Sequence, residues 1–79
     1  MEKAEIQTRV IKVISGVLGT EESMIGEKDN FIFDLGADSM QSLQLVAGFE
    51  EAFDIEMDED KALEVQTVDA AVDFIAQYL

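Results

Sequence analysis

The stretch that decides the fold is DLGADSMQSLQLVAGFEEAF, which covers residues 34–53. Gly36 permits a tight backbone turn, and either Asp38 or Ser39 can cap the first N–H groups of a helix that follows. If Asp38 is the cap, Gln41 occupies the third helical position and completes an approximate capping box. Beyond it, apolar residues recur at helical spacing along one stripe, which consists of Leu45, Val46, Phe49, Ala52 and Phe53. The stretch therefore predicts a turn followed by an amphipathic helix.

Two further segments show the same helical periodicity. The first ends before Gly19, a suitable left-handed C-cap, and its stripe consists of Ile6, Val10, Val13, Ile14, Val17 and Leu18. The last follows Thr67, a suitable N-cap, and its stripe consists of Val68, Ala71, Val72, Ile75 and Leu79. Because helices this short are not stable alone, they must pack their stripes together. We expect an all-α helical bundle in which residues 1–79 form one domain.

The two connections between these segments differ in length and character. Residues 19–38 make a long link for so small a domain, so we expect side chains docked in the core to hold it: Ile25, Phe31 and Leu35. Residues 58–63, in the second link, can form a short helical turn with Met57 and Leu63 as apolar anchors.

Composition excludes several classes of function. The 79 residues include no Cys and no His, which excludes disulfides, thiolate zinc sites and Ser-His or Cys-His catalytic centres. We therefore expect no catalysis by the chain itself.

The net charge of −13 disfavours binding to nucleic acid and anionic lipid and favours partners with basic surfaces. No run is long enough to span a membrane or to form a signal peptide, so we expect a cytoplasmic protein. Acidic residues near Asp58 suggest calcium binding as another class, but no window has the spacing of an EF-hand, so we expect no metal site.

Ser39 is the candidate site residue, and two interpretations of it are open. In the first, it only helps to begin a helix. In the second, its hydroxyl lies at a helix N-terminus, where a phosphate ester would meet free N–H groups and a favourable dipole. Because the chain has no His or Cys and no evident base, Ser39 is a poor nucleophile, so another enzyme would have to modify it.

The motif Asp34-Leu35-Gly36-Ala37-Asp38-Ser39-Met40 resembles the attachment motif of the acyl carrier protein family, D-L-G-x-D-S-L. The likeness covers most of the chain. It includes Val17-Leu18-Gly19, Phe31, Leu45-Val46, residues 50–56 (EEAFDIE) and residues 67–75 (TVDAAVDFI).

The resemblance implies a four-helix bundle with a long first loop and a short third helix. It implies that Ser39, within a motif that includes Gly36 and Asp38, carries 4′-phosphopantetheine transferred from coenzyme A by a phosphopantetheinyl transferase. The arm would hold acyl groups as thioesters in the biosynthesis of fatty acids, a specialised lipid or a polyketide. Further partners would be acyltransferases and ketosynthases with basic docking patches, and the free chain would be a monomer. The alternative is an acidic helical interaction module without a prosthetic group.

The resemblance also indicates the surface that partners recognise, which we expect to comprise Met40, Gln41, Gln44, Glu50, Glu51 and Glu56. Several positions depart from the usual pattern of the family. Met40 replaces a Leu, Asp58 stands where Pro is common, and Gln41 and Gln44 stand where acidic residues are common, which weakens attraction to a generic basic patch. These departures leave open whether the carrier serves housekeeping fatty acid synthesis or a dedicated pathway.

Two other departures allow two interpretations each. Gly48 is either tolerated inside its helix or required for a close approach or for room beside an acyl chain. Phe33, where the family often has a polar residue, either covers Ile32 and its loop neighbours or lies exposed as a partner contact.

Overall fold

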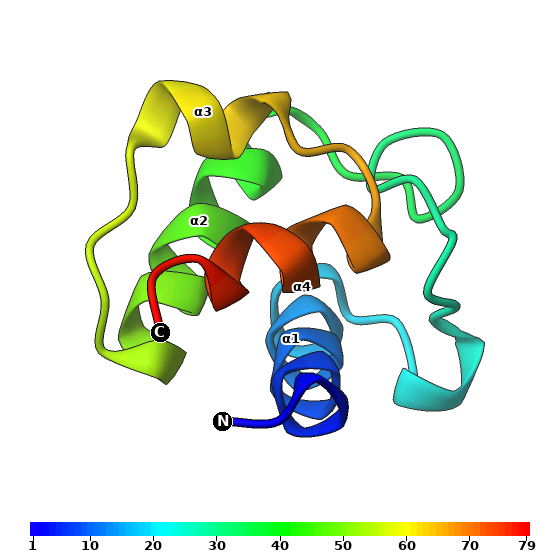
Figure 1. Cartoon of the computed structure of the whole chain (residues 1–79). Coiled ribbons are helices and arrows are strands. Elements are labelled where there is room, and N and C mark those ends of the chain that lie inside the picture. The colour runs from blue at the N-terminus through cyan, green and yellow to red at the C-terminus, as the bar shows by residue number, and fades with distance from the viewer.

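The computed structural model describes residues 1–79 and contains four α-helices and no β-strand (Figure 1). Helix α1 spans Lys3–Leu18, α2 spans Ser39–Phe53, α3 spans Glu59–Glu64 and α4 spans Val68–Ala76. A short 3-10 turn, η1, covers Glu22–Met24. The prediction of an all-α bundle with a long first link and a short third helix is confirmed.

The helices begin and end where local chemistry favours it. Gly19 ends α1 in the left-handed conformation, with φ of 71°, which glycine adopts without steric cost. The Asp58 carboxylate accepts a hydrogen bond from Lys61 N at 3.1 Å and caps α3. The Thr67 hydroxyl accepts one from Ala70 N at 3.3 Å and caps α4. The N-terminal caps of both later helices are thus side chains of the preferred types.

The core lies where α1 packs against both α2 and α4, while α3 covers part of α2 (Figure 1). All of its buried residues are apolar, and no polar or charged residue is buried. The most deeply buried side chains come from α1 and α4 and are Ile6, Val10, Ile14, Val68, Val72 and Ile75. Burial of these stripes provides the main driving force for association of helices that are too short to be stable alone.

Gly48 marks the closest approach of α1 and α2. A Cβ atom at this position would lie 2.7 Å from Val13 Cγ1 and 3.9 Å from Val17 Cγ2. Since real Cβ atoms essentially never come within 3.0 Å of a neighbour, the absence of a side chain lets the two helices pack this closely. Of the interpretations open for Gly48, the structure supports the close helix approach.

Three apolar residues expected in the core are exposed. Ala52 lies at the edge of the α2 stripe, where its methyl group stays in contact with solvent. In the short α3, Ala62 is the buried residue, and Leu63 points partly into solvent. Leu79 is exposed because α4 ends at Ala76, three residues before it. The core expectation was wrong at these three positions, which lie at stripe edges or beyond helix ends.

Candidate functional site

Ser39 is the first residue of α2, and its side chain is exposed. Asp38, rather than Ser39, caps the helix: Asp38 Oδ1 accepts a hydrogen bond from Gln41 N at 2.8 Å. Asp38 N donates in return to Gln41 Oε1 at 3.2 Å, which completes the expected capping box. Because Asp38 supplies the cap, the Ser39 hydroxyl makes no hydrogen bond within the chain. The hydroxyl thus lies exposed, without a partner, at the positive end of the helix dipole.

A compact turn precedes this serine, and Asn30 organises it. Asn30 Oδ1 accepts hydrogen bonds from Ile32 N at 2.9 Å and from Phe33 N at 3.0 Å. Asn30 N donates to Asp34 Oδ2 at 2.7 Å, which ties the start of the turn to the first residue of the motif. The side chains of Asn30 and Asp34 thus accept hydrogen bonds from nearby backbone N–H groups, as Asn and Asp commonly do in turns. The motif therefore approaches α2 along a defined path.

The end of the turn anchors the site to the core. Gly36 adopts φ of 75°, a left-handed conformation that favours glycine. The chain then returns on itself, since Ala37 N donates to Phe31 O at 2.8 Å. Phe31 and Ala37 are both buried, so the residues on either side of the turn are fixed in the core. Ser39, two residues further on, is held at the surface by an anchored neighbour.

Backbone contacts join the long first link to the start of α4. Phe31 N donates to Gln66 O at 2.9 Å, and Asn30 and Thr67 form an isolated antiparallel bridge. The expected docking of the link is confirmed, with Ile25 and Phe31 buried and Leu35 half-buried against the core.

Charged side chains reinforce the same junction. Asp69 Oδ2 accepts from Lys28 Nζ at 2.9 Å, and Asp69 Oδ1 accepts from the Thr67 hydroxyl at 2.6 Å. The hydrogen bonds from Thr67 and then from Lys28 lower the pKa of Asp69 to about 2. The Asp69 hydrogen bond in turn raises the pKa of Lys28. The loop that leads to Ser39 is thus tied to α4 by side chains as well as by backbone.

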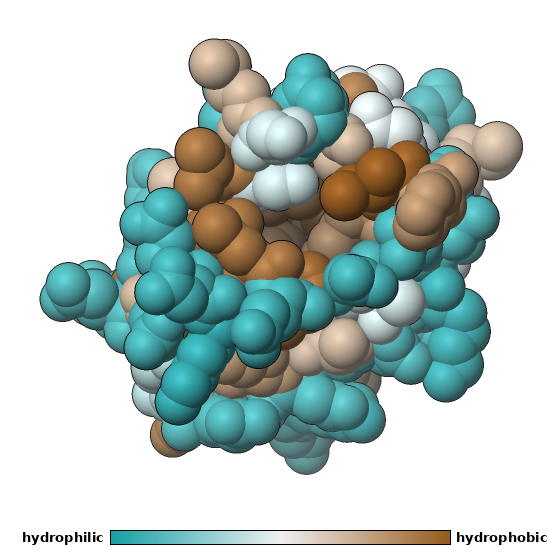
Figure 2. All heavy atoms as spheres, turned by 90° about the horizontal axis from the view of Figure 1, so that it is seen from above, coloured by the Kyte–Doolittle hydropathy of each residue, from teal (hydrophilic) through white to brown (hydrophobic).

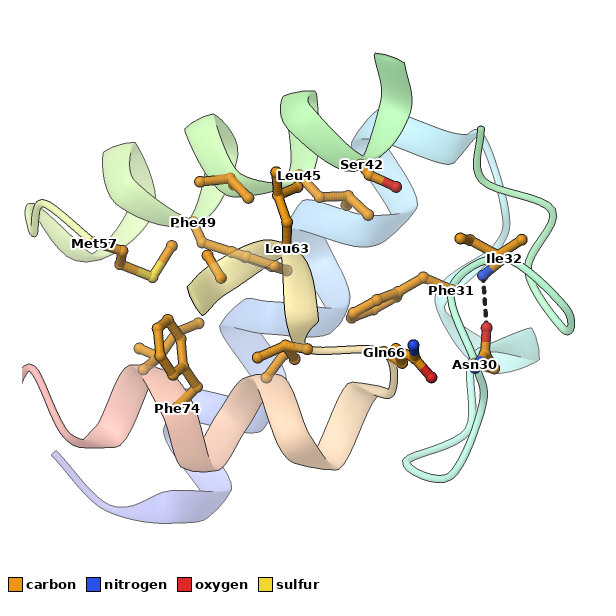
Figure 3. Close-up of a pocket in the computed structure, with 15 residues that line it drawn as sticks. Asn30, Phe31, Ile32, Ser42, Leu45, Phe49, Met57, Leu63, Gln66 and Phe74 are labelled. Carbon is orange, nitrogen blue, oxygen red and sulfur yellow. Dashed lines mark hydrogen bonds between the residues drawn. The ribbon is translucent and has the colours of Figure 1, made fainter. Parts of the chain in front are cut away.

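An apolar cavity of about 90 Å³ lies between α2, α3, α4 and the link. Figure 2 shows its opening as a hollow edged by apolar residues on one face of the molecule. Figure 3 shows Asn30, Phe31, Ile32, Ser42 and Gln66 gathered at one end and Met57 and Phe74 at the other. Twelve of the fifteen lining residues are hydrophobic. Ser42 is one helical turn beyond Ser39, so one end of the cavity lies near the candidate site.

The residues expected to contact partners differ in exposure and in their hydrogen bonds within the chain. The side chains of Met40, Gln44, Glu51 and Glu56 are exposed, whereas Gln41 is half-buried and engaged in the capping box. Glu50 is also half-buried, and its Oε2 accepts a hydrogen bond from Met57 N at 2.8 Å. Glu50 therefore stabilises the segment that follows α2, in addition to any contact that it makes with a partner.

Sequence reasoning missed the organising roles of Asn30 and Lys28. A signal for Asn30 was present, because Asn commonly begins turns of this kind. No local signal could have paired Lys28 with Asp69, which lies 41 residues away in the sequence. The structure brings together no cluster of Asp and Glu that could hold a metal ion, and none of its helices has the length and apolar content that a bilayer crossing requires.

Comparison with known proteins places this chain beside carriers of phosphopantetheine. Residues 8–75 match the family model described as the phosphopantetheine attachment site. The chain is also 43% identical over 77 residues to an acyl carrier protein of Guillardia theta, and the match covers 98% of this chain and 95% of that relative.

Proposed function

Because the chain belongs to the acyl carrier protein family, whose phosphopantetheine attachment domain it contains, we propose that Ser39 is the residue that bears 4′-phosphopantetheine. The observation that carries this proposal is the Ser39 hydroxyl at the start of α2, which is exposed and makes no hydrogen bond within the chain. We further propose that residues 1–79 act as one carrier domain, which presents acyl groups to other enzymes and does not transform them itself.

The residues around Ser39 fit a phosphate ester. In a helix the first N–H groups lack partners within the helix, and together with the dipole they favour negative charge. Here Gln41 N is already bonded to Asp38, and Ser42 N donates to Asp38 O at 2.9 Å, which leaves the N–H groups of Ser39 and Met40. Gly36 and Asp38 contribute by setting the turn and the helix start, so they position the hydroxyl.

Attachment is a transfer between coenzyme A and the protein. The Ser39 Oγ attacks the phosphorus next to the pantetheine, and an Oγ–P bond forms while the P–O bond to the nucleotide breaks. Adenosine 3′,5′-bisphosphate leaves, and the hydroxyl proton passes to a base on the transferase. Once bound, the group supplies a terminal thiol that holds an acyl chain as a thioester. The chain has no Cys, so no thiol of its own competes for the acyl group.

The apolar cavity supports a role in sheltering the acyl chain. Its walls are largely hydrophobic, and one end lies near Ser39. At about 90 Å³ it is smaller than the engineered apolar cavity of about 150 Å³ that admits benzene. A long hydrocarbon chain therefore requires the helices to separate locally as it enters.

Intact mass spectrometry tests the attachment site. The chain is incubated with coenzyme A and a phosphopantetheinyl transferase, and it should gain the mass of one phosphopantetheine. Ser39→Ala should gain nothing, whereas Ser42→Ala, a matched control one helical turn away, should be modified. An unmodified wild-type chain would refute the carrier proposal and favour an interaction module without a prosthetic group.

The uncharged start of α2 supports a dedicated pathway over generic fatty acid synthesis. Gln41→Glu with Gln44→Glu should raise turnover by a generic fatty-acid ketosynthase, because added negative charge strengthens attraction to its basic patch. Ser23→Glu with Gln77→Glu adds the same two negative charges at exposed positions outside α2 and is the control for net charge. Unchanged turnover in the double variant would count against this explanation of pathway choice.

A further inference from the structure

Four apolar side chains near Ser39 lie exposed, and together we call them the apolar rim: Ile32, Phe33, Met40 and Leu43. Two precede Ser39 in the turn, and two follow it on α2. Phe33 is the most exposed of them, at 87% of its surface. Ile32 also lines the cavity, so the apolar rim meets the cavity at this residue. Of the interpretations open for Phe33, the structure supports the exposed one.

The turn holds Phe33 in place without using its side chain. The backbone N–H of Phe33 donates to Asn30 Oδ1, and Gly36 N donates to Ile32 O at 3.1 Å. These bonds depend on the backbone and on Asn30, so any residue at position 33 satisfies them. The backbone at Phe33 is therefore fixed, while its ring presents a large apolar surface to solvent. Such pre-organisation lowers the entropic cost of binding a partner.

Charge on α2 is divided between its two ends. No charged residue occurs from Ser39 to Phe49, whereas Glu50, Glu51 and Asp54 follow at the other end. Glu51 lies 12 positions beyond Ser39, which corresponds to about 18 Å along the helix. A complementary partner surface therefore has an apolar part near Ser39 and a basic part about 18 Å away.

We infer that Phe33 is a docking point for the phosphopantetheinyl transferase that modifies Ser39, received by an apolar pocket beside the active site of that enzyme. This inference rests on the proposed function, because an enzyme that acts on Ser39 must cover the surface around it. Ser39 follows Phe33 by six residues, so their Cα atoms lie at most roughly 20 Å apart. A standard interface of about 800 Å² on each partner is roughly 30 Å across, which is wide enough for one footprint to include both residues.

Kinetics of the modification reaction test this inference. The assay measures kcat and KM for the carrier with coenzyme A and a broad-specificity phosphopantetheinyl transferase. Phe33→Gln should raise KM by about 5- to 30-fold, as expected for loss of an aromatic anchor, with kcat little changed. Phe33→Tyr, which keeps the ring, should restore most of the wild-type KM. Leu79→Gln, an exposed apolar residue at the chain terminus, should leave KM unchanged.

The outcomes separate this inference from the proposed function. If the wild-type chain is not modified at all, the proposed function fails. If it is modified and Phe33→Gln has the wild-type KM, or shows no larger effect than Leu79→Gln, only the role of Phe33 is refuted. Sedimentation of wild type and Phe33→Gln provides a second measurement. If the wild type is a dimer and Phe33→Gln is a monomer, Phe33 contacts a second copy of the chain and the inference is overturned.

Discussion

The close approach of α1 and α2 predicts that Gly48→Ala destabilises the protein, although alanine is the better helix former. Because glycine is less favourable than alanine inside a helix, the difference in helix propensity alone would stabilise the protein by roughly 1 kcal/mol. The new Cβ would lie 2.7 Å from Val13 Cγ1, however, and a β-branched side chain on a helix has one strongly preferred rotamer. Overpacking of this kind costs about 1–3 kcal/mol. The free energy of unfolding should therefore fall by about 1 kcal/mol.

Urea denaturation in two backgrounds measures this balance. In the wild-type background, Gly48→Ala should lower the free energy of unfolding, and in a domain of this size a loss of 1 kcal/mol lowers Tm by about 4–8 °C. In a Val13→Ala background the overlapping methyl group is gone, so the same substitution should stabilise by roughly 1 kcal/mol. The sign of the effect should thus reverse, with a coupling of about 2 kcal/mol between the two sites. Equal effects of the same sign in both backgrounds would refute the reasoning.

Three further predictions concern the caps and charges. Asp38→Ala should lower the free energy of unfolding by about 1 kcal/mol in urea denaturation and Asp38→Asn by much less, and equal losses would contradict the capping assignment. Glu50→Ala should lower the free energy of unfolding by about 1–3 kcal/mol in the same assay, because Met57 N loses its acceptor. The neighbouring change Glu51→Ala should alter it by less than about 0.5 kcal/mol. A similar loss in both variants would contradict the structural role of Glu50. The pKa of Asp69 is lowered from 3.8 to about 2, so its carboxylate stabilises the fold above about pH 4 and this contribution is lost as the pH falls toward 2. The difference in urea midpoint between wild type and Asp69→Asn should therefore shrink below about pH 4, and a constant difference from about pH 7 to pH 3 would contradict it.

The helices and their caps could be predicted from the sequence because the forces that set them are local. Periodic apolar residues define the buried face of each helix, and Gly19, Asp38 and Thr67 end or begin helices through contacts within a few residues. The exposed position of Ser39 follows from the same local logic, once Asp38 is the cap. The capping box at the start of α2 was therefore predictable down to the residue that completes it.

Features that depend on tertiary contacts could not be predicted in this way. Whether Phe33 lies exposed depends on the path of a turn that Asn30 holds, and its sequence neighbourhood allowed both outcomes. Glu50 resembles any acidic surface residue until the chain brings Met57 N to its carboxylate. Leu63 was expected as an apolar anchor, but it lines the open cavity and stays partly exposed, so Ala62 is the buried residue of α3.

The shortness of α3 makes it the weakest wall of the cavity. This wall of the cavity has six residues and one buried side chain, whereas the opposite wall belongs to the fifteen-residue α2. Detaching it exposes little apolar surface and breaks few hydrogen bonds, so it opens at a free energy well below that of global unfolding. If an acyl chain lies in the cavity as proposed, its release then requires only this local opening and not the unfolding of the whole bundle.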